Sequence, residues 1–199
     1  AGESSQELLS PEPKAIRNLG VIDGYAYACG MAREVYRRRG ENDWQPMNAP
    51  REGDEVCGFE AIDGFDRGEL YAVGWNGEIW QWHDEQWVQR ASPTNLILTG
   101  VCCAGDGLVY ACGQNGTLLV GRGEAWEPID IDDAIIDFWD IHWFEGKVYV
   151  ASLSNLFTVS RDAGLEPVAF GADAPASCYR LTSAEDVLWS IGADDIFSF

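Results

Sequence analysis

Apolar residues occur along this chain in short runs that turn residues separate. One run covers residues 69–74 and is followed by Asn76-Gly77 and by a second apolar run over residues 79–82. Asn-Gly between apolar runs predicts a tight β-hairpin, because both central positions of that turn require positive φ. No stretch of about 12 residues shows the three-to-four-residue spacing of an amphipathic helix. The pattern therefore predicts an all-β chain.

A short phrase of the type Tyr-Ala-Cys-Gly recurs through the sequence. It begins at Tyr27, Tyr71, Tyr110, Tyr149 and, more loosely, Trp189, so successive copies start at nearly equal intervals. A second marker follows each phrase at an almost constant distance, at Trp44, Trp87, Trp126 and Leu165. The period of about 40 residues is typical of one four-stranded propeller blade, and helical HEAT-type repeats share it. The strand pattern favours the propeller.

The repeats predict a single β-propeller domain over residues 1–199, with strands a to d in each blade. The units run approximately over residues 15–50, 51–93, 94–130, 131–172 and 173–199. The last unit has candidates for strands a to c only, and residues 6–11 resemble a strand d. Because pairing the two termini removes exposed strand edges, we expect residues 6–11 to close the fifth blade. The alternative is a fragment of a six- or seven-bladed ring.

The turn sequences carry a resemblance to a known superfamily. Gly74-Trp75-Asn76-Gly77 and Gly113-Gln114-Asn115-Gly116, each followed by the Trp of strand d, resemble the WD40/YVTN/BNR-like β-propellers. Ser160-Arg161-Asp162-Ala163-Gly164 resembles the opening of the Asp-box turn of the BNR subgroup, although Glu166 and Pro167 depart from that motif. The resemblance covers almost the whole chain. It implies the fold and leaves the function open, because propellers serve as enzymes, scaffolds and inhibitors.

The charge balance changes which partners are plausible. Thirteen Lys and Arg oppose 33 Asp and Glu, which gives a net charge of −20 at pH 7. Such a surface repels phosphate backbones and anionic lipid, so we expect no direct nucleic-acid or membrane binding. The acidic excess lies after residue 40, and we expect the run Arg37-Arg38-Arg39 on a c–d turn. We expect the chain to be lopsided in charge, and a monomer.

The cysteines indicate a reducing compartment rather than a disulfide framework. Cys29 and Cys112 occupy the same position of different blades, too far apart to bridge, and Cys57, Cys102, Cys103 and Cys178 fall at the inner strands. Buried free thiols in such positions are typical of a cytoplasmic protein. The only two His residues are far apart in the sequence, and no Cys or His pair has the spacing of a zinc site. We expect no cofactor and no metal.

Two chemical functions are considered for the acidic loops. A glycosidase-like propeller enzyme would use paired carboxylates, but few Arg residues accompany them, and no Ser/His/Asp arrangement or phosphate-binding Gly loop occurs. A calcium site could use Asp130-Ile131-Asp132-Asp133, but these residues lack the Gly and the distal Glu of an EF-hand loop. We therefore expect a non-catalytic protein, with a metal-dependent or glycosidase-like enzyme as the third choice.

Protein binding is the interpretation that the same loops favour. Aromatic anchors among carboxylates suit a cationic protein surface, because Trp supplies desolvated contact area and the acids accelerate association. The expected partner-binding residues are Trp75, Glu78, Glu52, Asp54, Glu55, Asp130, Asp132, Asp133, Asp137, Trp139, Asp140, Asp194 and Asp195. Small acidic proteins without an active site resemble the immunity proteins of bacterial toxin systems. The hypothesis is an immunity protein that neutralises a basic toxin, for example a nuclease; the alternative is a BNR-like scaffold or assembly factor.

Overall fold

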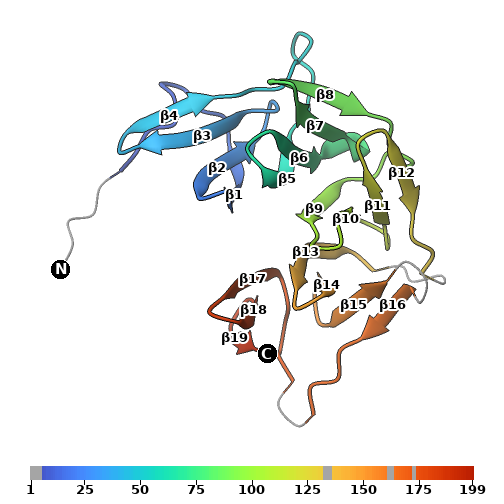
Figure 1. The fold of residues 1–199 in the computed structure, drawn as a ribbon. Helices are drawn as coiled ribbons and strands as arrows, with labels where there is room; N and C mark the ends of the chain where they lie inside the picture. Colours follow the sequence, from blue (N-terminus) through green and yellow to red (C-terminus); the bar gives the residue numbers. More distant parts are fainter. Residues whose placement is uncertain (1–5, 132–135, 161–163, 172–173) are drawn as a thin grey trace.

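The computed structural model describes residues 6–131, 136–160, 164–171 and 174–199, and its strands form five antiparallel sheets. Figure 1 shows the sheets as blades that follow one another around a common centre in the order of the sequence. The five-bladed, all-β propeller that the repeats predict is confirmed. A short 3-10 helix, η1 (Trp75–Gly77), lies between two strands of the second blade. In these described ranges no helix has the length and apolar character needed to span a bilayer.

Each blade runs from an inner strand a to an outer strand. The first two blades are β1 (Ile16–Ile22), β2 (Tyr25–Gly30), β3 (Val35–Gly40) and β4 (Asp43–Pro46), and β5 (Phe59–Asp66), β6 (Glu69–Gly74), β7 (Ile79–His83) and β8 (Gln86–Arg90). The next two are β9 (Leu98–Cys103), β10 (Val109–Gly113), β11 (Leu118–Arg122) and β12 (Ala125–Pro128), and β13 (Phe138–Phe144), β14 (Lys147–Ser152), β15 (Leu156–Ser160) and β16 (Gly164–Pro167). The fifth has β17 (Arg180–Ala184), β18 (Val187–Ile191) and β19 (Ile196–Ser198).

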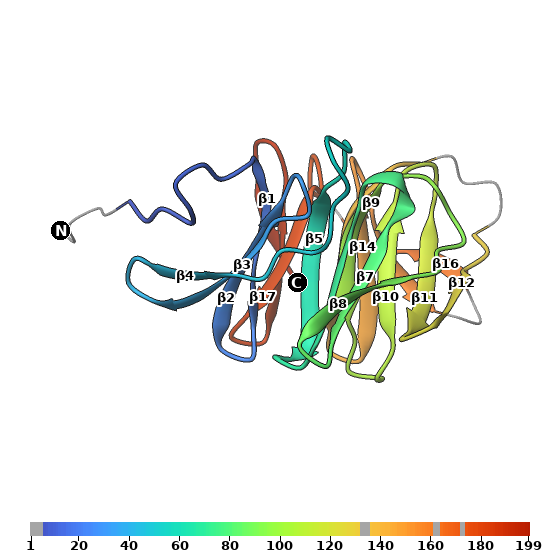
Figure 2. The ribbon, with the colours of Figure 1, turned by 90° about the horizontal axis from the view of Figure 1, so that it is seen from above.

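The strands run across the thickness of the disc, so their turns gather at two opposite rims (Figure 2). We call the rim with the turns from strand b to strand c and the connections from strand d to the next strand a the upper rim, as it is drawn in Figure 2. The turns from a to b and from c to d form the lower rim. The loops that the sequence singled out therefore lie together on the upper rim.

The repeated sequence phrases have identifiable structural roles. The Asn-Gly pairs lie in upper-rim turns, where Asn76 and Asn115 have φ of 58° and 51° and each following Gly has φ of 70°. The Gly that ends the phrase permits a close backbone approach: a Cβ at Gly74 would collide with the carbonyl oxygen of Gly58. A Cβ at Gly113 would collide in the same way with the carbonyl oxygen of Ile97. The phrase is therefore fixed by turn geometry and by contact with the incoming chain.

Both faces of the central blades are buried, which explains their nearly continuous apolar strands. Side chains alternate along a strand, so neighbouring residues point to opposite faces of the sheet. In β6, Leu70 and Ala72 pack into the core shared with the first blade. The alternate residues Tyr71 and Val73 pack into the core shared with the third blade. Each strand therefore contributes side chains to two seams, where a seam is the packed interface between two adjacent blades.

Two carboxylates link inner strands of adjacent blades. Asp63 of β5 accepts the backbone N–H of Cys103 in β9 at 2.7 Å. Asp140 of β13 accepts the backbone N–H of Leu181 in β17 at 2.9 Å. Both carboxyls are surrounded by protein atoms, and this burial raises the pKa of each to about 6. The sequence places Asp140 at a partner surface, whereas the structure uses its carboxylate to join two blades.

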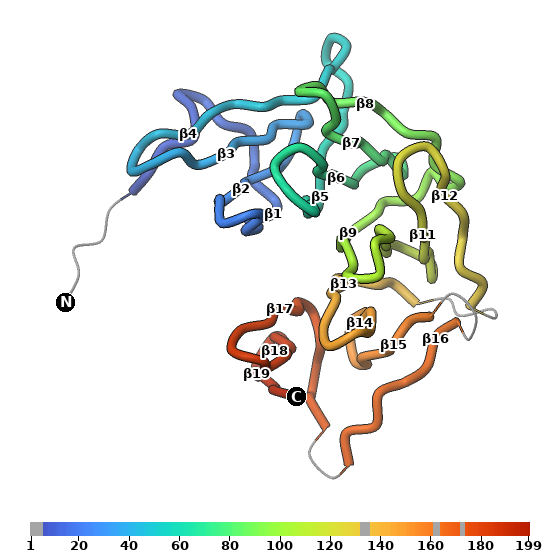
Figure 3. The backbone as a smooth tube through the Cα atoms, viewed as in Figure 1, coloured from blue at the N-terminus to red at the C-terminus, as the bar shows by residue number. Residues whose placement is uncertain are grey.

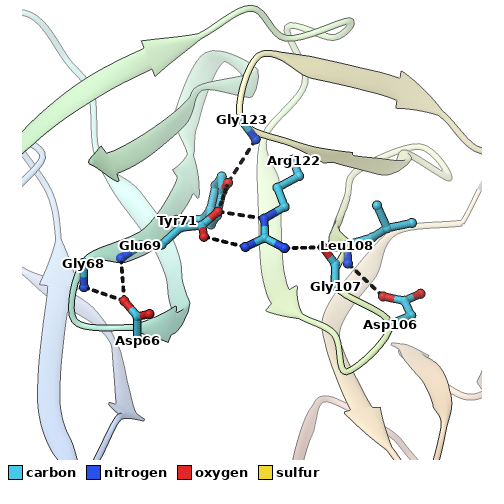
Figure 4. Close-up of polar contacts among 9 residues, drawn as sticks. All are labelled: Asp66, Gly68, Glu69, Tyr71, Asp106, Gly107, Leu108, Arg122 and Gly123. Carbon is cyan, nitrogen blue, oxygen red and sulfur yellow. Dashed lines mark hydrogen bonds and ion pairs between the residues drawn. The ribbon is translucent and has the colours of Figure 1, made fainter. Parts of the chain in front are cut away.

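Arginine side chains join the blades at their rims. Arg122 of β11 donates from Nε and Nη2 to the two carboxylate oxygens of Glu69 in β6, at 2.9 and 2.6 Å. Figure 4 shows this pair beside Tyr71, whose hydroxyl donates to Glu69 and accepts the N–H of Gly123. The hydrogen bonds from Arg122 lower the pKa of the Glu69 carboxyl. Similar pairs join the first two blades, namely Arg17–Glu60, Arg33–Glu78 and Arg67–Asp23.

The N-terminal segment differs from the expectation. Residues 6–11 do not close the fifth blade, which has three strands among the described residues. Instead Glu7 accepts two hydrogen bonds from Arg38, at 2.9 and 2.6 Å, and one from the indole of Trp44. The segment lies beside β4, as Figure 3 shows. The physical reason is the positive charge of β3. The Arg37–Arg39 run lies in that strand rather than on a c–d turn, and the Glu7 carboxylate forms an ion pair with Arg38.

All six cysteines are free thiols, and five of them are buried. Cys29 and Cys112 lie in equivalent strands β2 and β10, as the repeats predict, and Cys102 and Cys103 lie in β9. Burial raises the pKa of Cys29 and Cys112, because the thiolate form is disfavoured away from water. The thiols therefore act as small apolar side chains in the seams between blades.

Replacing Asp63 by Asn is expected to change how stability depends on pH. Burial raises the pKa of this carboxyl from its ordinary value of 3.8 to about 6. The folded chain therefore holds a proton that the unfolded chain releases, so this group contributes stability that is complete below pH 3.8 and is lost as pH rises through 6. Relative to Asp63→Asn, the native chain should lose about 2 kcal/mol of unfolding free energy between pH 4 and pH 7 in urea titrations.

The matched control is Asp84→Asn, because the Asp84 side chain is 82% exposed. Its unfolding free energy should follow that of the native chain at every pH. Parallel pH profiles for Asp63→Asn and the native chain would show that the buried carboxyl does not titrate in this range.

Thiol titration is expected to separate the folded and unfolded chains. At pH 8 the buried thiols should react with a disulfide reagent on the timescale of unfolding, because burial keeps them protonated and out of reach. In urea without reductant, six thiols per chain should react at once. A count below six would reveal a disulfide, and fast reaction of more than one thiol in the folded chain would contradict the burial of the five buried side chains.

Candidate binding surface on the upper rim

Most of the acidic residues expected at a partner surface lie on the upper rim and face solvent. Glu52, Asp54 and Glu55 are exposed in the connection from β4 to β5. Asp130 and Asp137 are exposed on either side of the connection from β12 to β13, and Asp194 is exposed in the turn from β18 to β19. Asp132 and Asp133 lie outside the described residues. The exposed acids thus come from three loops of the same rim.

A hollow of about 720 Å³ opens on this rim between the first two blades. The residues that line it come from four segments: Arg33, Pro50, Arg51, Glu52, Glu55, Asn76, Glu78, Trp80 and Gln89. The structure therefore brings Glu52, Glu55 and Glu78 together, although Glu78 belongs to a different loop of the sequence from the other two.

Arg33 is buried at the base of this hollow and makes four hydrogen bonds within the chain. Its Nε and Nη2 donate to the two oxygens of Glu78, at 2.7 and 2.6 Å, and Nη1 donates to the carbonyl of Pro50. Nη2 also reaches Glu55 at 3.1 Å, and the guanidinium lies 5.0 Å from the Trp80 ring centre. The hydrogen bond to Glu78 is the main cause that raises the pKa of Arg33.

This ion pair corrects the expected role of Glu78. The Glu78 side chain is 6% exposed, and one of its oxygens also accepts the indole N–H of Trp80. A carboxylate held by a buried guanidinium in this way is a structural link between the first two blades, because removing either partner would strand a buried charge. The sequence pattern did not reveal that Arg33 holds Glu78 in this way.

The two Trp residues proposed as anchors differ in exposure. Trp75 is half-buried, and its indole N–H donates to Glu60 at 2.7 Å. Trp139 is 40% exposed at the start of β13, and its ring lies edge-on to Tyr179 with 5.6 Å between ring centres. Trp139 is therefore the more available aromatic contact of the two.

Exposed apolar side chains distinguish the two rims. Among the described residues, Val56 and Leu153 are exposed within upper-rim connections, and Trp139 is exposed at the start of the strand that follows one. The described a–b and c–d turns of the lower rim contain no exposed large apolar side chain, although Val21 and Phe199 are exposed at strand ends toward that rim. The sequence reasoning missed Val56 and Leu153, whose only signal was an apolar residue within a polar loop. Apolar anchors among acids therefore occur on the upper rim.

Some of the predicted acids are engaged within the chain. Asp137 accepts the backbone N–H of Asn115 at 2.9 Å while it remains exposed. Asp195 accepts the N–H of Ala176 at 2.7 Å and is only partly exposed. These carboxylates order the loops of the third to fifth blades. Within the described ranges, no three His, Cys, Asp or Glu side chains lie close enough to hold a metal ion.

A second hollow of about 790 Å³ lies toward the lower rim between the first two blades. Arg37, Arg67 and His83 line it together with Asp66 and Glu69, so its walls carry both signs of charge. It contains no exposed large apolar side chain among the residues that the structure describes. The sequence did not point to this hollow, and its mixed charges favour no ligand of one sign.

Comparison with known proteins gives a relative in sequence and several in fold. No family model matches the chain. Over 188 residues the chain is 53% identical to the immune protein Tsi7 of Pseudomonas aeruginosa, which takes in 92% of this chain. The match takes in 61% of that protein, so the chain spans about three-fifths of the length of the curated relative that it matches.

Solved structures share the propeller fold at low sequence identity. Virginiamycin B lyase from Staphylococcus aureus has a TM-score of 0.74 at 12% identity, over 96% of this chain and 71% of that one. YCF48 from Cyanidioschyzon merolae has 0.70 at 13%, over 98% and 69%, and YCF48 bound to D1 peptide has 0.69 at 18%, over 98% and 66%. These likenesses show the fold alone. The chain is thus a β-propeller that is similar, over nearly its whole length, to part of a bacterial immune protein.

Proposed function

We propose that this chain acts as an immunity protein that binds and neutralises a basic toxin domain through its upper rim. The observation that carries the proposal is that exposed apolar side chains and exposed acids occur together in the upper-rim connections, whereas the described lower-rim turns have exposed acids but no exposed large apolar side chain. Its similarity to an immune protein supports a role in toxin immunity. Apolar contacts of this kind supply binding energy, and surrounding charges supply steering and specificity.

The use of the Arg residues supports a cationic partner. Seven of the eleven Arg side chains form ion pairs within the described residues: Arg17, Arg33, Arg38, Arg39, Arg67, Arg90 and Arg122. These guanidinium charges are therefore neutralised within the chain, and the excess of 33 acids leaves it a net charge of −20. A nuclease toxin fits this surface, because an enzyme that binds anionic nucleic acid presents the opposite charge.

The proposed mechanism is occlusion without catalysis. The acids of the upper rim would occupy the cationic surface that the toxin needs for its substrate, and Trp139 and Val56 would be desolvated in the contact. The ring would act as a monomer in the cytoplasm, a compartment that suits six free thiols. A BNR-like scaffold remains the competing function. The salt dependence of association distinguishes the two, because electrostatically steered association slows steeply with ionic strength, whereas association through a large apolar interface depends less on it.

Reversing two acids of the upper rim is expected to slow association. The variant Glu52→Lys/Asp54→Lys should reduce the association rate of a purified toxin domain, encoded beside the gene for this chain, by about 10- to 100-fold at low salt. Both side chains are exposed, so folding should be unaffected. Stopped-flow mixing at several salt concentrations measures the rate.

The matched control is Glu41→Lys/Glu85→Lys, which makes the same change in net charge on exposed turns of the lower rim. Its association rate should fall by less than about threefold, because charges beyond a Debye length are largely screened. Equal effects of the two variants would show that overall charge, rather than the upper rim, attracts the toxin.

Removing the aromatic anchor is expected to weaken the complex through its dissociation rate. Trp139→Ala should raise Kd by about 30-fold, as for a desolvated aromatic anchor, mainly by faster dissociation. Trp139→Phe should retain most of the affinity, because a ring in this position can still pack against Tyr179. Circular dichroism confirms folding of both variants. An unchanged Kd for Trp139→Ala would place the interface elsewhere on the chain.

A further inference from the structure

The repeats allow equivalent positions of the five blades to be compared directly. The aromatic residue that begins the phrase in strand b faces the following blade in the first three repeats. Tyr27, Tyr71 and Tyr110 are 0%, 0% and 4% exposed, and Tyr149 is partly buried. The equivalent Trp189 of the last blade is 36% exposed. β18 therefore carries an aromatic side chain of the kind that is buried between blades in the earlier repeats, but no described residue covers it to the same degree.

The next position on the same face of strand b gives a sharper contrast. Cys29, Val73, Cys112 and Ala151 are each 0% exposed, because the following blade packs on them. Ile191 occupies the same register position and is 38% exposed. Its side chain is the largest apolar group of the set but has the least cover.

The first blade has a similarly exposed apolar face on its inner strand. Ile62, Val101, Ile141 and Leu181 lie at one register position of the inner strands and face the preceding blade. Their exposure is 5%, 6%, 3% and 7%. Leu19 of β1 occupies the same register position and is 67% exposed. The outward faces of the first and fifth blades therefore have the composition of seams without a neighbour.

The sheet of the fifth blade also has an unpaired edge. The other four blades have four strands each, whereas β19 pairs with β18 on one side and with no described strand on the other. An unpaired strand edge beside an exposed apolar face, with Ile196 67% exposed, is a surface that propellers normally cover.

We infer that the two end faces, defined by Leu19 and Val21 on β1 and by Trp189, Ile191 and Ile196 on β18 and β19, are blade-docking faces. Each receives another four-stranded blade of the same repeat, and the working ring has about seven blades. Five blades that align with 71%, 69% and 66% of three similar propellers imply about this number. The roughly two-fifths of the immune protein that the chain does not match has room for two blades of about 40 residues.

A second copy of this chain is a poorer occupant of the end faces. Two five-bladed chains joined at both ends would make a ring of ten blades, whereas propellers have roughly four to eight. Copies joined at one end only would form an open, growing assembly, which is a heterologous contact that does not close. Blades of the same repeat satisfy both faces and the free edge of β19 at once.

Accessibility of an introduced thiol tests this inference without any toxin. Five of the six native thiols are buried and Cys103 is partly buried, so Val21→Cys and Ile196→Cys each add one exposed thiol above the background of the native chain of 199 residues. Both should react with a disulfide reagent at the rate of an exposed thiol. In a hybrid in which this chain replaces the matched segment of the P. aeruginosa immune protein, both rates should fall by at least ~100-fold.

Val56→Cys is the matched control, because Val56 is 66% exposed on the upper rim, away from both end faces. It should react equally fast in the two chains. The same substitutions at the aligned positions of the P. aeruginosa protein itself give a second measurement that does not depend on folding of the hybrid. Equal rates for Val21→Cys in the short and long chains would overturn the inference, as would protection in the short chain, which would show that another copy covers the face.

Discussion

Burial of both faces of the three central blades is the constraint on which this structure depends. A sheet with one wet face needs apolar residues at alternate positions only, whereas a propeller strand must suit two neighbours at once. Leu70 and Tyr71 are adjacent in β6, yet they pack into different cores. The fold is therefore a series of seams, and each seam is made from every second residue of two sheets. This arrangement explains the apolar content of a chain that is also strongly acidic.

The same series of seams decides where charge can reside. Guanidinium groups span the gap between blades, as Arg33 does to Glu78 and Arg122 to Glu69, so the scarce cations are used as links. Arg suits this task because its planar fork holds a carboxylate through two hydrogen bonds. The acids left over are at the loops, where water solvates them. An electronegative surface and a series of firmly joined blades thus have one physical origin in how the few cations are distributed.

The sequence could predict whatever depends on one blade alone. Turn chemistry identified the Asn-Gly hairpins, and the period of the repeat identified the strands and the Trp that begins strand d. Contacts between blades could not be read in this way, because a repeat shows which positions are equivalent but not which neighbour each one meets. Glu78 and Asp140 looked like surface acids for this reason, and the structure assigns both to seams. Glu7 was misplaced because its partner, Arg38, is distant in sequence.

Because each blade contacts only the blades beside it, the molecule is close to one-dimensional in its energetics. Stability in such an array is a sum of blade and seam terms, and unfolding can begin at a free end and proceed inward. The amide hydrogens of β9 and β10 should consequently exchange with solvent most slowly, and protection should decline in both directions toward β1 and β19. A change at a central seam would then lower the stability of the whole array, whereas an equal change at an end would be felt by one blade.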